Sequence, residues 1–400
     1  MQELSTISTL DNIVLLDAES GDGYRRWCEL AAPAEDYRRP DVASDDVCLL
    51  LYTSGTTSAP KGVQHTHNTV LAEQSTLTAL FDPADPDISL VSFPPGHIAG
   101  VACVLQSLLS GRRAVFMDTW DPVRAVDAIA EYGVTSTAGT PLHLEQILEL
   151  GSLGGRLDSL HEFLVGAAPV TEDLGRRAAA VGVTTFRSSG ATEHPTVTGE
   201  HHGASQRARL STDGRPLPGS AVRILSPEGA DVAPGSDGEV VVRGPEQFIG
   251  YRDKALNDDA FTGDGWFRTG DLGHLDDDGR LVITDRIKDV IIRAGETISS
   301  GQIEDVLNAH PAVAEGAAIA APHPRYGEVV AAVVVLHPGW ELDLDGLRVH
   351  YETFGLARQK TPEKLVIVGT LPRTALGKVR KAELRAVHFG VADTAVAQPD

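Results

Sequence analysis

The chain has 400 residues, of which 42% are hydrophobic and 22% are charged, an ordinary profile for a protein that folds around a buried core. Its formal net charge of −22 argues against the basic face that nucleic-acid binding needs, so we expect no nucleic-acid partner. Any anionic ligand must be held by local positive groups.

The number of cysteines and the length of the apolar runs indicate where in the cell the protein is expected. The three cysteines, Cys28, Cys48 and Cys103, are too few and too scattered for a disulfide framework or a zinc site. The first ten residues contain no basic patch followed by an apolar run, so we expect no signal peptide. The longest apolar stretch, residues 329–336, is far shorter than a membrane span. We therefore expect a cytoplasmic protein with no membrane partner.

Strand and helix patterns alternate in the first half of the chain. The apolar run at residues 47–52 ends in Thr, Ser and Gly and predicts a strand that enters a loop. Helical periodicity predicts helices over residues 121–132, behind an Asp-Pro start, and 141–150. A buried strand is expected at residues 163–165, ending at Gly166. This alternation predicts an α/β core.

After Gly203 short strands separated by turns predict a β-rich subdomain, with strands at 221–225, 238–243 and 280–284. Beyond a boundary near 286–289 we expect helices at 302–309 and 344–353 and strands at 317–320, 329–336 and 364–368. The prediction is an α/β protein with a large N-terminal domain, residues 1–286, and a small α+β C-terminal domain, residues 287–400.

The strongest local pattern is the segment YTSGTTSAPKG at residues 52–62. Small hydroxyl residues and glycine let the backbone approach a polyphosphate, whose oxygens accept from hydroxyls and main-chain N–H groups, and Lys61 adds a positive charge. The spacing differs from that of a Walker A loop. A segment of this composition is ordinarily a loop with no ligand. Whether it binds phosphate is therefore judged from the other motifs of the chain.

This segment resembles the phosphate-binding signature of the adenylate-forming superfamily, which includes acyl-CoA synthetases, aryl-CoA ligases, peptide-synthetase adenylation domains and luciferases. Six further resemblances follow in that family's order: GAAP at 166–169, GATE at 190–193, GEV at 238–240 with GY at 250–251, WFRTGD at 266–271, DRIKD at 285–289 and PRTALGK at 372–378. One such match could be chance, but seven in order are not.

The resemblance implies ATP, Mg²⁺ and coenzyme A as cofactors and a small-molecule carboxylic acid as substrate. A carboxylate attacks the α-phosphorus of ATP, so the site must supply cations and donors. By resemblance, Lys378 bridges the carboxylate and the α-phosphate, Glu193 holds Mg²⁺, and Asp271 accepts from the ribose hydroxyls. The residues assigned to cofactor binding are Thr53, Ser54, Gly55, Thr56, Thr57, Lys61, Gly166, Ala167, Ala168, Gly190, Ala191, Thr192, Asp271, Arg286, Lys288 and Gly295.

The thioester step implies a mobile C-terminal domain. In the family this domain swings about the hinge at Lys288, so that the catalytic lysine leaves and the loop around Gly295 enters. Glycine there leaves room for a pantetheine arm because it has no Cβ. The acid class follows from His97, which stands where amino-acid-activating members carry an Asp for the α-ammonium group. We expect His97 to gate an acid without an α-amine, and the small residues at 136–140, 165–166 and 188–189 to form a roomy acid pocket.

The sequence also departs from the family pattern. Only 48 residues precede Leu49, so we expect an N-terminally shortened member whose acid pocket is more open or is completed by a partner. Ser58 stands for a usual Gly and Ser189 for an aromatic residue that stacks on adenine, which predicts slow adenylation.

Three functions remain at this stage. The leading one is an acyl-CoA ligase. The alternatives are loading of a carrier protein, and a partial-reaction relative that receives its adenylate from a partner enzyme. Retention of Glu193, Asp271, Arg286 and Lys378 favours the full ligase.

Overall fold

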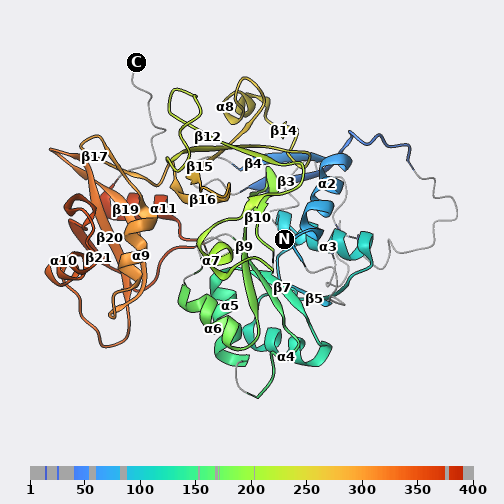
Figure 1. Cartoon of the computed structure of the whole chain (residues 1–400), viewed down its shortest axis with the longest axis horizontal. Coiled ribbons are helices and arrows are strands. Elements are labelled where there is room, and N and C mark those ends of the chain that lie inside the picture. The colour runs from blue at the N-terminus through green and yellow to red at the C-terminus, as the bar shows by residue number, and fades with distance from the viewer. Residues whose placement is uncertain are drawn as a thin grey trace. The chain divides into compact units, whose positions relative to one another are not determined.

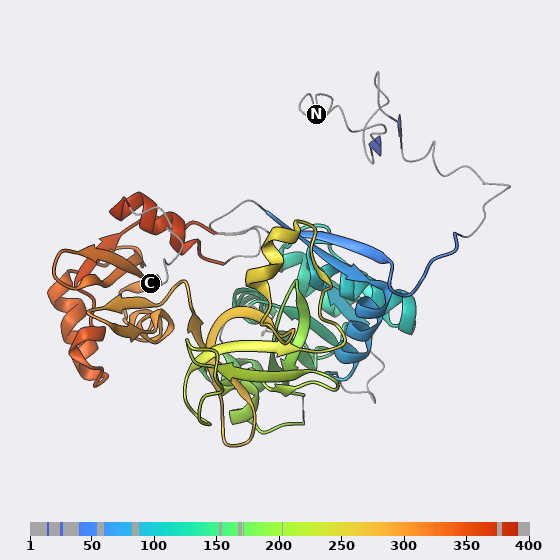
Figure 2. The ribbon, with the colours of Figure 1, turned by 90° about the horizontal axis from the view of Figure 1, so that it is seen from above.

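The computed structural model describes residues 40–53, 60–81, 88–151, 154–166, 170, 172–201, 203–373 and 378–390, together with the backbone of two short strands before them. The chain forms two compact units, Met1–Ala43 and Ser44–Asp400. In the first unit, β1 (Val14–Leu15) and β2 (Arg25–Arg26) pair in parallel. The second unit carries every other element in Figures 1 and 2.

A seven-stranded sheet forms the centre of the second unit. Its order is β11-β10-β9-β8-β7-β5-β6, in which β5 to β9 are parallel and the other two strands add antiparallel at one edge. The strands are β5 (Ile88–Val91), β6 (Arg113–Phe116), β7 (Ser136–Gly139), β8 (Glu162–Val165), β9 (Thr184–Ala191), β10 (His194–Gly199) and β11 (Arg215–Pro216). Parallel strands require crossover connections, and helices supply them. The predicted α/β core is confirmed.

Six helices surround this sheet in the chain order α2 (His67–Thr78), α3 (Ile98–Ser110), α4 (Pro122–Tyr132), α5 (Pro141–Gly151), α6 (Glu172–Ala180) and α7 (Gln206–Ser211). The helix predicted at 121–132 begins one residue later, because the Asp121 side chain caps it by accepting from the backbone N–H of Val123 and Arg124. Gly133, at φ 64°, ends the helix in the left-handed region. Ile129 of α4 and Ile147 of α5 are fully buried in the core that covers the sheet.

Two antiparallel sheets form the β-rich part. The larger has the order β12-β13-β15-β16 and the smaller the order β14-β4-β3. Their bounds are β12 (Ala221–Leu225), β13 (Gly238–Arg243), β15 (Phe267–Leu275), β16 (Leu281–Arg286), β14 (Gly250–Tyr251), β4 (Lys61–Thr66) and β3 (Val47–Thr53), with η2 (Lys254–Leu256) and α8 (Asn257–Ala260) between β14 and β15. Phe248, Tyr251 and Phe267 pack together beneath them. The expected β-rich subdomain is confirmed.

Residues after 290 form a smaller α+β layer. Its sheet has the order β18-β17-β20-β19, and β21 pairs with β20. Alternate residues of β20 face opposite sides: Val330 and Val334 lie in one apolar core, Val329 and Val333 in the other. The elements are β17 (Ile291–Arg293), β18 (Glu296–Ile298), α9 (Ser300–Asn308), β19 (Val313–His323), β20 (Gly327–Leu336), α10 (Leu344–Thr353), η3 (Arg358–Lys360), β21 (Lys364–Ile367) and α11 (Lys381–Phe389). Among the described residues, no helix is long and apolar enough to cross a bilayer.

A buried ion pair joins the seven-stranded sheet to the four-stranded sheet. Arg187 on β9 donates from Nη2 to Asp213 Oδ1 at 2.5 Å, with side chains only 11% and 7% exposed. The other carboxylate oxygen of Asp213 accepts from the backbone N–H of Ile283 on β16 at 2.9 Å. Asp213 also accepts at its carbonyl from the Thr198 hydroxyl on β10. One residue therefore fixes three strands of two sheets.

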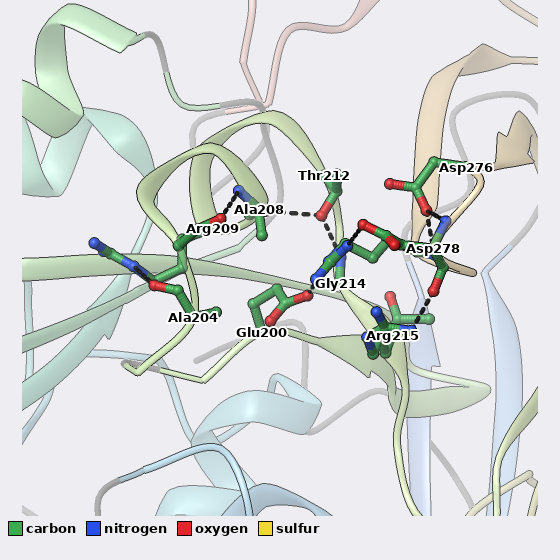
Figure 3. Close-up of polar contacts among 12 residues, drawn as sticks. Glu200, Ala204, Ala208, Arg209, Thr212, Gly214, Arg215, Asp276 and Asp278 are labelled. Carbon is green, nitrogen blue, oxygen red and sulfur yellow. Dashed lines mark hydrogen bonds and ion pairs between the residues drawn. The ribbon is translucent and has the colours of Figure 1, made fainter.

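The segment before Asp213 is held by local polar bonds (Figure 3). The Arg209 side chain donates to the carbonyl of Ala204, and the Thr212 hydroxyl donates to the carbonyl of Ala208. The same hydroxyl oxygen accepts from the N–H of Gly214. These bonds close the chain around α7, so the backbone reaches Asp213 in a fixed direction.

We expect Asp213→Ala to destabilise the fold by roughly 3–5 kcal/mol, because it leaves the Arg187 guanidinium buried without its counter-charge. The matched control is Asp173→Ala, which removes the exposed Asp173–Arg176 pair of α6 and should change stability by less than about 1 kcal/mol. Urea unfolding followed by circular dichroism measures both. Equal losses in the two variants would contradict the role of Asp213.

Candidate active site

The residues assigned by resemblance fall into two groups. Ser54, Gly55, Thr56, Thr57, Ala167 and Ala168 lie outside the described residues, as does Ser58. The others are described, and most of them lie at strand ends. Thr53 ends β3 and is paired with Lys61, the first residue of β4, so the phosphate-loop segment connects two neighbouring strands.

The carboxyl ends of β7, β8 and β9 meet at one edge of the large sheet, where open α/β sheets bind ligands. The N–H of Gly166 donates to the carbonyl of Gly139 at 3.0 Å, which continues the ladder past β8. Beside them, Ser189, Gly190 and Ala191 of β9 line a recess together with Thr269 and Asp271 of β15. Ser189 thus lies in the same recess as Asp271.

Glu193 sits in the turn between β9 and β10, and this turn is held at three points, two of them on Glu193 itself. Its carbonyl accepts from the N–H of Phe248 at 2.8 Å, and its Oε1 accepts from the Tyr251 hydroxyl at 2.7 Å. Nε2 of the buried His65 donates to the carbonyl of Thr192 at 2.8 Å. Burial lowers the pKa of His65 and raises that of Tyr251, so imidazole and phenol are both neutral at ordinary pH. The carboxylate of Glu193 therefore has a fixed position.

Lys61 lies over the ring of the same tyrosine, with Nζ 5.1 Å from the ring centre. One aromatic side chain thus contacts both a lysine of the phosphate-loop segment and the carboxylate of Glu193.

Asp271 is surrounded by positive charge. It lies opposite Arg286 in the β15–β16 ladder, and Nε of Arg286 is 3.1 Å from its Oδ1. Burial raises the pKa of Asp271, while the charges of Arg286, Lys378 and Lys288 oppose that rise. The arrangement is an acceptor carboxylate ringed by cations, suited to hold a polyhydroxyl group beside an anion.

Lys378 comes from the far end of the chain to the same place. The surrounding protein lowers its pKa, Arg286 and Lys288 lower it further, and Asp271 raises it. His97 is close enough for the Lys378 charge to lower its pKa, beyond the larger effect of burial. Nδ1 of His97 accepts from the N–H of Ala99 at 3.2 Å and so caps α3. The site gathers Asp271, Arg286, Lys288, Lys378 and His97.

The segment expected to act as a hinge is held by polar bonds before Lys288 and at its carbonyl. Before it, Asp285 accepts from the N–H of Ser300, and from its hydroxyl at 2.9 Å. Arg385 of α11 donates to the carbonyl of Lys288 at 3.1 Å. Gly295 lies in the turn between β17 and β18, at φ 86° after Ala294 at φ 52°, the pattern of a type I′ hairpin.

The donor set fits a magnesium ion that arrives with a nucleotide. Among the described residues there is no cluster of three or more His, Cys, Asp or Glu side chains that could hold a metal. Mg²⁺ is commonly bound by one or two carboxylates together with phosphates and water. A single carboxylate, Glu193, beside the phosphate-loop segment meets that requirement.

Sequence reasoning missed the residues that hold Glu193. The motif at 250–251 includes Tyr251 but predicts no contact for its side chain. No motif includes His65 or Phe248. Tyr251 and Glu193 are 58 positions apart, so only the folded chain brings them together.

Comparisons with known proteins agree with this geometry. The model of the AMP-binding enzyme family matches residues 3–252, and that of the AMP-binding enzyme C-terminal domain matches residues 302–378. The chain is 35% identical to a feruloyl-CoA synthase of Amycolatopsis sp over 361 residues, which are 89% of this chain and 73% of the relative. It is 31% identical to the fatty acid–[acyl-carrier-protein] ligase ScoC of Streptomyces coeruleorubidus, over 92% of this chain and 73% of that one. ATP-bound MatB from Rhodopseudomonas palustris has the same fold, with a TM-score of 0.83, 31% identity, and coverage of 90% of this chain and 71% of that one.

Gly190 allows the Glu193 turn to close, and we expect Gly190→Ala to disturb it. A Cβ at this position would lie 1.7 Å from the carbonyl oxygen of Pro195, so the backbone of the hairpin would have to shift. We expect a loss of roughly 1–3 kcal/mol in stability and weaker ATP binding. Gly263→Ala is the control, because no atom lies within 4 Å of its added Cβ. Calorimetric unfolding with and without ATP compares them; equal behaviour would show that the hairpin tolerates a Cβ.

Proposed function

The chain belongs to the AMP-binding enzyme family and is an AMP-forming acid–thiol ligase, and we propose that its acid carries no α-amine and that its thiol is coenzyme A. The observation that carries this proposal is the ion pair of Asp271 with Arg286 at 3.1 Å, with Lys378, from a distant part of the chain, within electrostatic reach of that pair and of His97. Adenylation needs cations at the reacting phosphate, an acceptor for the ribose hydroxyls and an uncharged side chain beside the acid. In this proposal Lys378 and Arg286 are the cations, Asp271 is the acceptor and His97 is the uncharged side chain.

In the first half-reaction a carboxylate oxygen of the acid attacks the α-phosphorus of ATP, the bond to the β-phosphate bridge breaks, and pyrophosphate leaves. Lys378 contacts both anions and offsets the charge that gathers as they approach. Asp271 accepts from the ribose hydroxyls while Arg286 keeps its carboxylate oriented. Mg²⁺, when bound, neutralises phosphate charge, and Glu193 is the residue that would hold it.

The acid lies beside His97 in this proposal. The neutral imidazole offers no buried anion for an α-ammonium group, which favours acids without one. The residues at the carboxyl ends of the neighbouring strands are small, among them Gly139, Gly166 and Ser189, which favours a bulky or long acid. Feruloyl-CoA synthase, a relative by sequence, is named for an aromatic acid of this kind.

The second half-reaction transfers the acyl group from the adenylate to the thiol sulfur, with AMP as the leaving group and the thiol proton released. We assign the moving part to residues 287–400, turning at Lys288. ScoC is named for transfer to an acyl carrier protein, and carrier loading is therefore the second candidate acceptor.

The test is mass spectrometry of products from aromatic, fatty and α-amino acids with MgATP, alone, with CoA, and with a phosphopantetheinylated carrier protein. We expect acyl-adenylates from acids without an α-amine, and acyl-CoA when CoA is added. Lys378→Ala should lower adenylate formation by about 10²–10³ while still converting a supplied acyl-adenylate to the thioester. An adenylate from a proteinogenic amino acid would refute the acid class. Transfer to the carrier alone would refute CoA, and equal loss of both steps in the variant would refute the role of Lys378.

Gly295 should matter only for the thioester step. Because its φ of 86° strains any side chain, the informative pair is Gly295→Leu against Gly295→Ala, which share the strain and differ in bulk. We expect adenylation to be similar in both, and thioester formation in the leucine variant to be about tenfold slower or worse, since the larger side chain fills the path of the pantetheine arm. Single-turnover mixing of preformed adenylate with CoA measures this. Equal rates in the two variants would place the path elsewhere.

A further inference from the structure

The two carboxylate oxygens of Glu193 differ in their surroundings, which affects how each could contact a metal. Its Oε1 accepts from the Tyr251 hydroxyl at 2.7 Å, and no described residue donates a hydrogen bond to Oε2. The bond takes one of the two lone pairs of Oε1, so Oε2 is the oxygen with both of its lone pairs available to a metal.

Burial, strand pairing and ring packing fix the position of the Tyr251 side chain. It is 5% exposed, pairs with Val63 in the β14–β4 ladder, and donates its N–H to Asn257 Oδ1 at 2.7 Å. Its ring packs edge-on against Phe248, with centroids 4.9 Å apart. The N–H of Phe248 in turn donates to the carbonyl of Glu193. One short segment therefore fixes both the backbone and the carboxylate of Glu193.

We propose that Tyr251 is a positioning residue that biases metal preference: its hydrogen bond to Oε1 fixes the carboxylate of Glu193 and favours one-oxygen contact through Oε2, which suits Mg²⁺ better than Ca²⁺. Mg²⁺ demands near-octahedral geometry at about 2.0–2.1 Å, whereas Ca²⁺ accepts two oxygens of one carboxylate and six to eight ligands. The inference rests on the proposed function for the role of Glu193 as the metal ligand. Nothing in the sequence pattern assigns this contact to Tyr251.

The first experiment compares metal binding by native chain and Tyr251→Phe, which removes the hydroxyl and keeps the ring under Lys61. Calorimetric titration with ATP and Mg²⁺ or Ca²⁺, without any acid, gives the affinity for each metal nucleotide. We expect the Mg²⁺ affinity to fall by about tenfold, since a hydrogen bond to a charged group is lost, while Ca²⁺ affinity holds or rises. An unchanged ratio of the two affinities would overturn the proposal.

The matched control is Tyr351→Phe. Tyr351 is also buried, and its hydroxyl donates to the carbonyl of Ile303 at 2.6 Å, in a different apolar core from that of Tyr251. This variant loses the same chemical group, so thermal unfolding should report a comparable loss of stability in both. Only Tyr251→Phe should change the ratio of Mg²⁺ to Ca²⁺ affinity. The same change in both variants would mean that the ratio follows general loosening of the fold, which overturns the proposal.

A second measurement needs no variant. Crystals of the native chain with Mn²⁺ and a non-hydrolysable ATP analogue locate the metal by anomalous scattering. We expect one Glu193 oxygen at the metal and the Tyr251 hydroxyl still on the other. Contact through both oxygens, or a displaced tyrosine, would overturn the proposal. Because neither measurement uses an acid or a thiol, failure of the metal inference is distinguishable from failure of the proposed ligase activity.

Discussion

The recess between the seven-stranded and the four-stranded sheet, where we propose that the nucleotide binds, lies beside the buried bond between Arg187 and Asp213. The recess lies between β9, which carries Ser189 and Gly190, and β15, which carries Asp271. These strands belong to different sheets, and apolar packing alone sets their spacing only loosely. The Arg187–Asp213 pair, together with the bond from the N–H of Ile283, ties the parallel sheet to the strand next to β15. A charge that must be paired once buried has few acceptable positions, so the recess keeps its width.

The charge of the whole chain and the charge around Asp271 have opposite signs. The net charge of −22 would repel ATP from most of the surface. Around Asp271, however, Arg286, Lys288 and Lys378 stand within electrostatic reach of one another. Removal from water lowers the pKa of Lys378, and repulsion by Arg286 and Lys288 lowers it further. A polyphosphate bound as proposed would relieve that repulsion, so charges that repel one another here would favour the nucleotide.

The sequence predicted elements whose signals are local and missed those defined by distant contacts. The strand at 238–243 and the helix at 344–353 have the predicted bounds, because turn residues and caps mark them. The hairpin of β17 and β18 and the helix α3 escaped prediction, since their patterns are short or apolar throughout. In the site, motif order indicated residues such as Glu193 and Asp271, whose roles remain predictions. The hydroxyl of Tyr251 that holds Glu193, and the buried bond between Arg187 and Asp213, depend on pairings that no spacing reveals.

The bonds between Asp285 and Ser300 bear on the turning at Lys288 that is proposed for residues 287–400. They span the segment that contains Lys288, and both partners are polar groups for which water is an adequate substitute. The proposed rotation would exchange them for bonds to solvent at little net cost, whereas an apolar contact would resist separation in proportion to its area. In that motion the two bonds would be a contact that breaks and re-forms with each turnover.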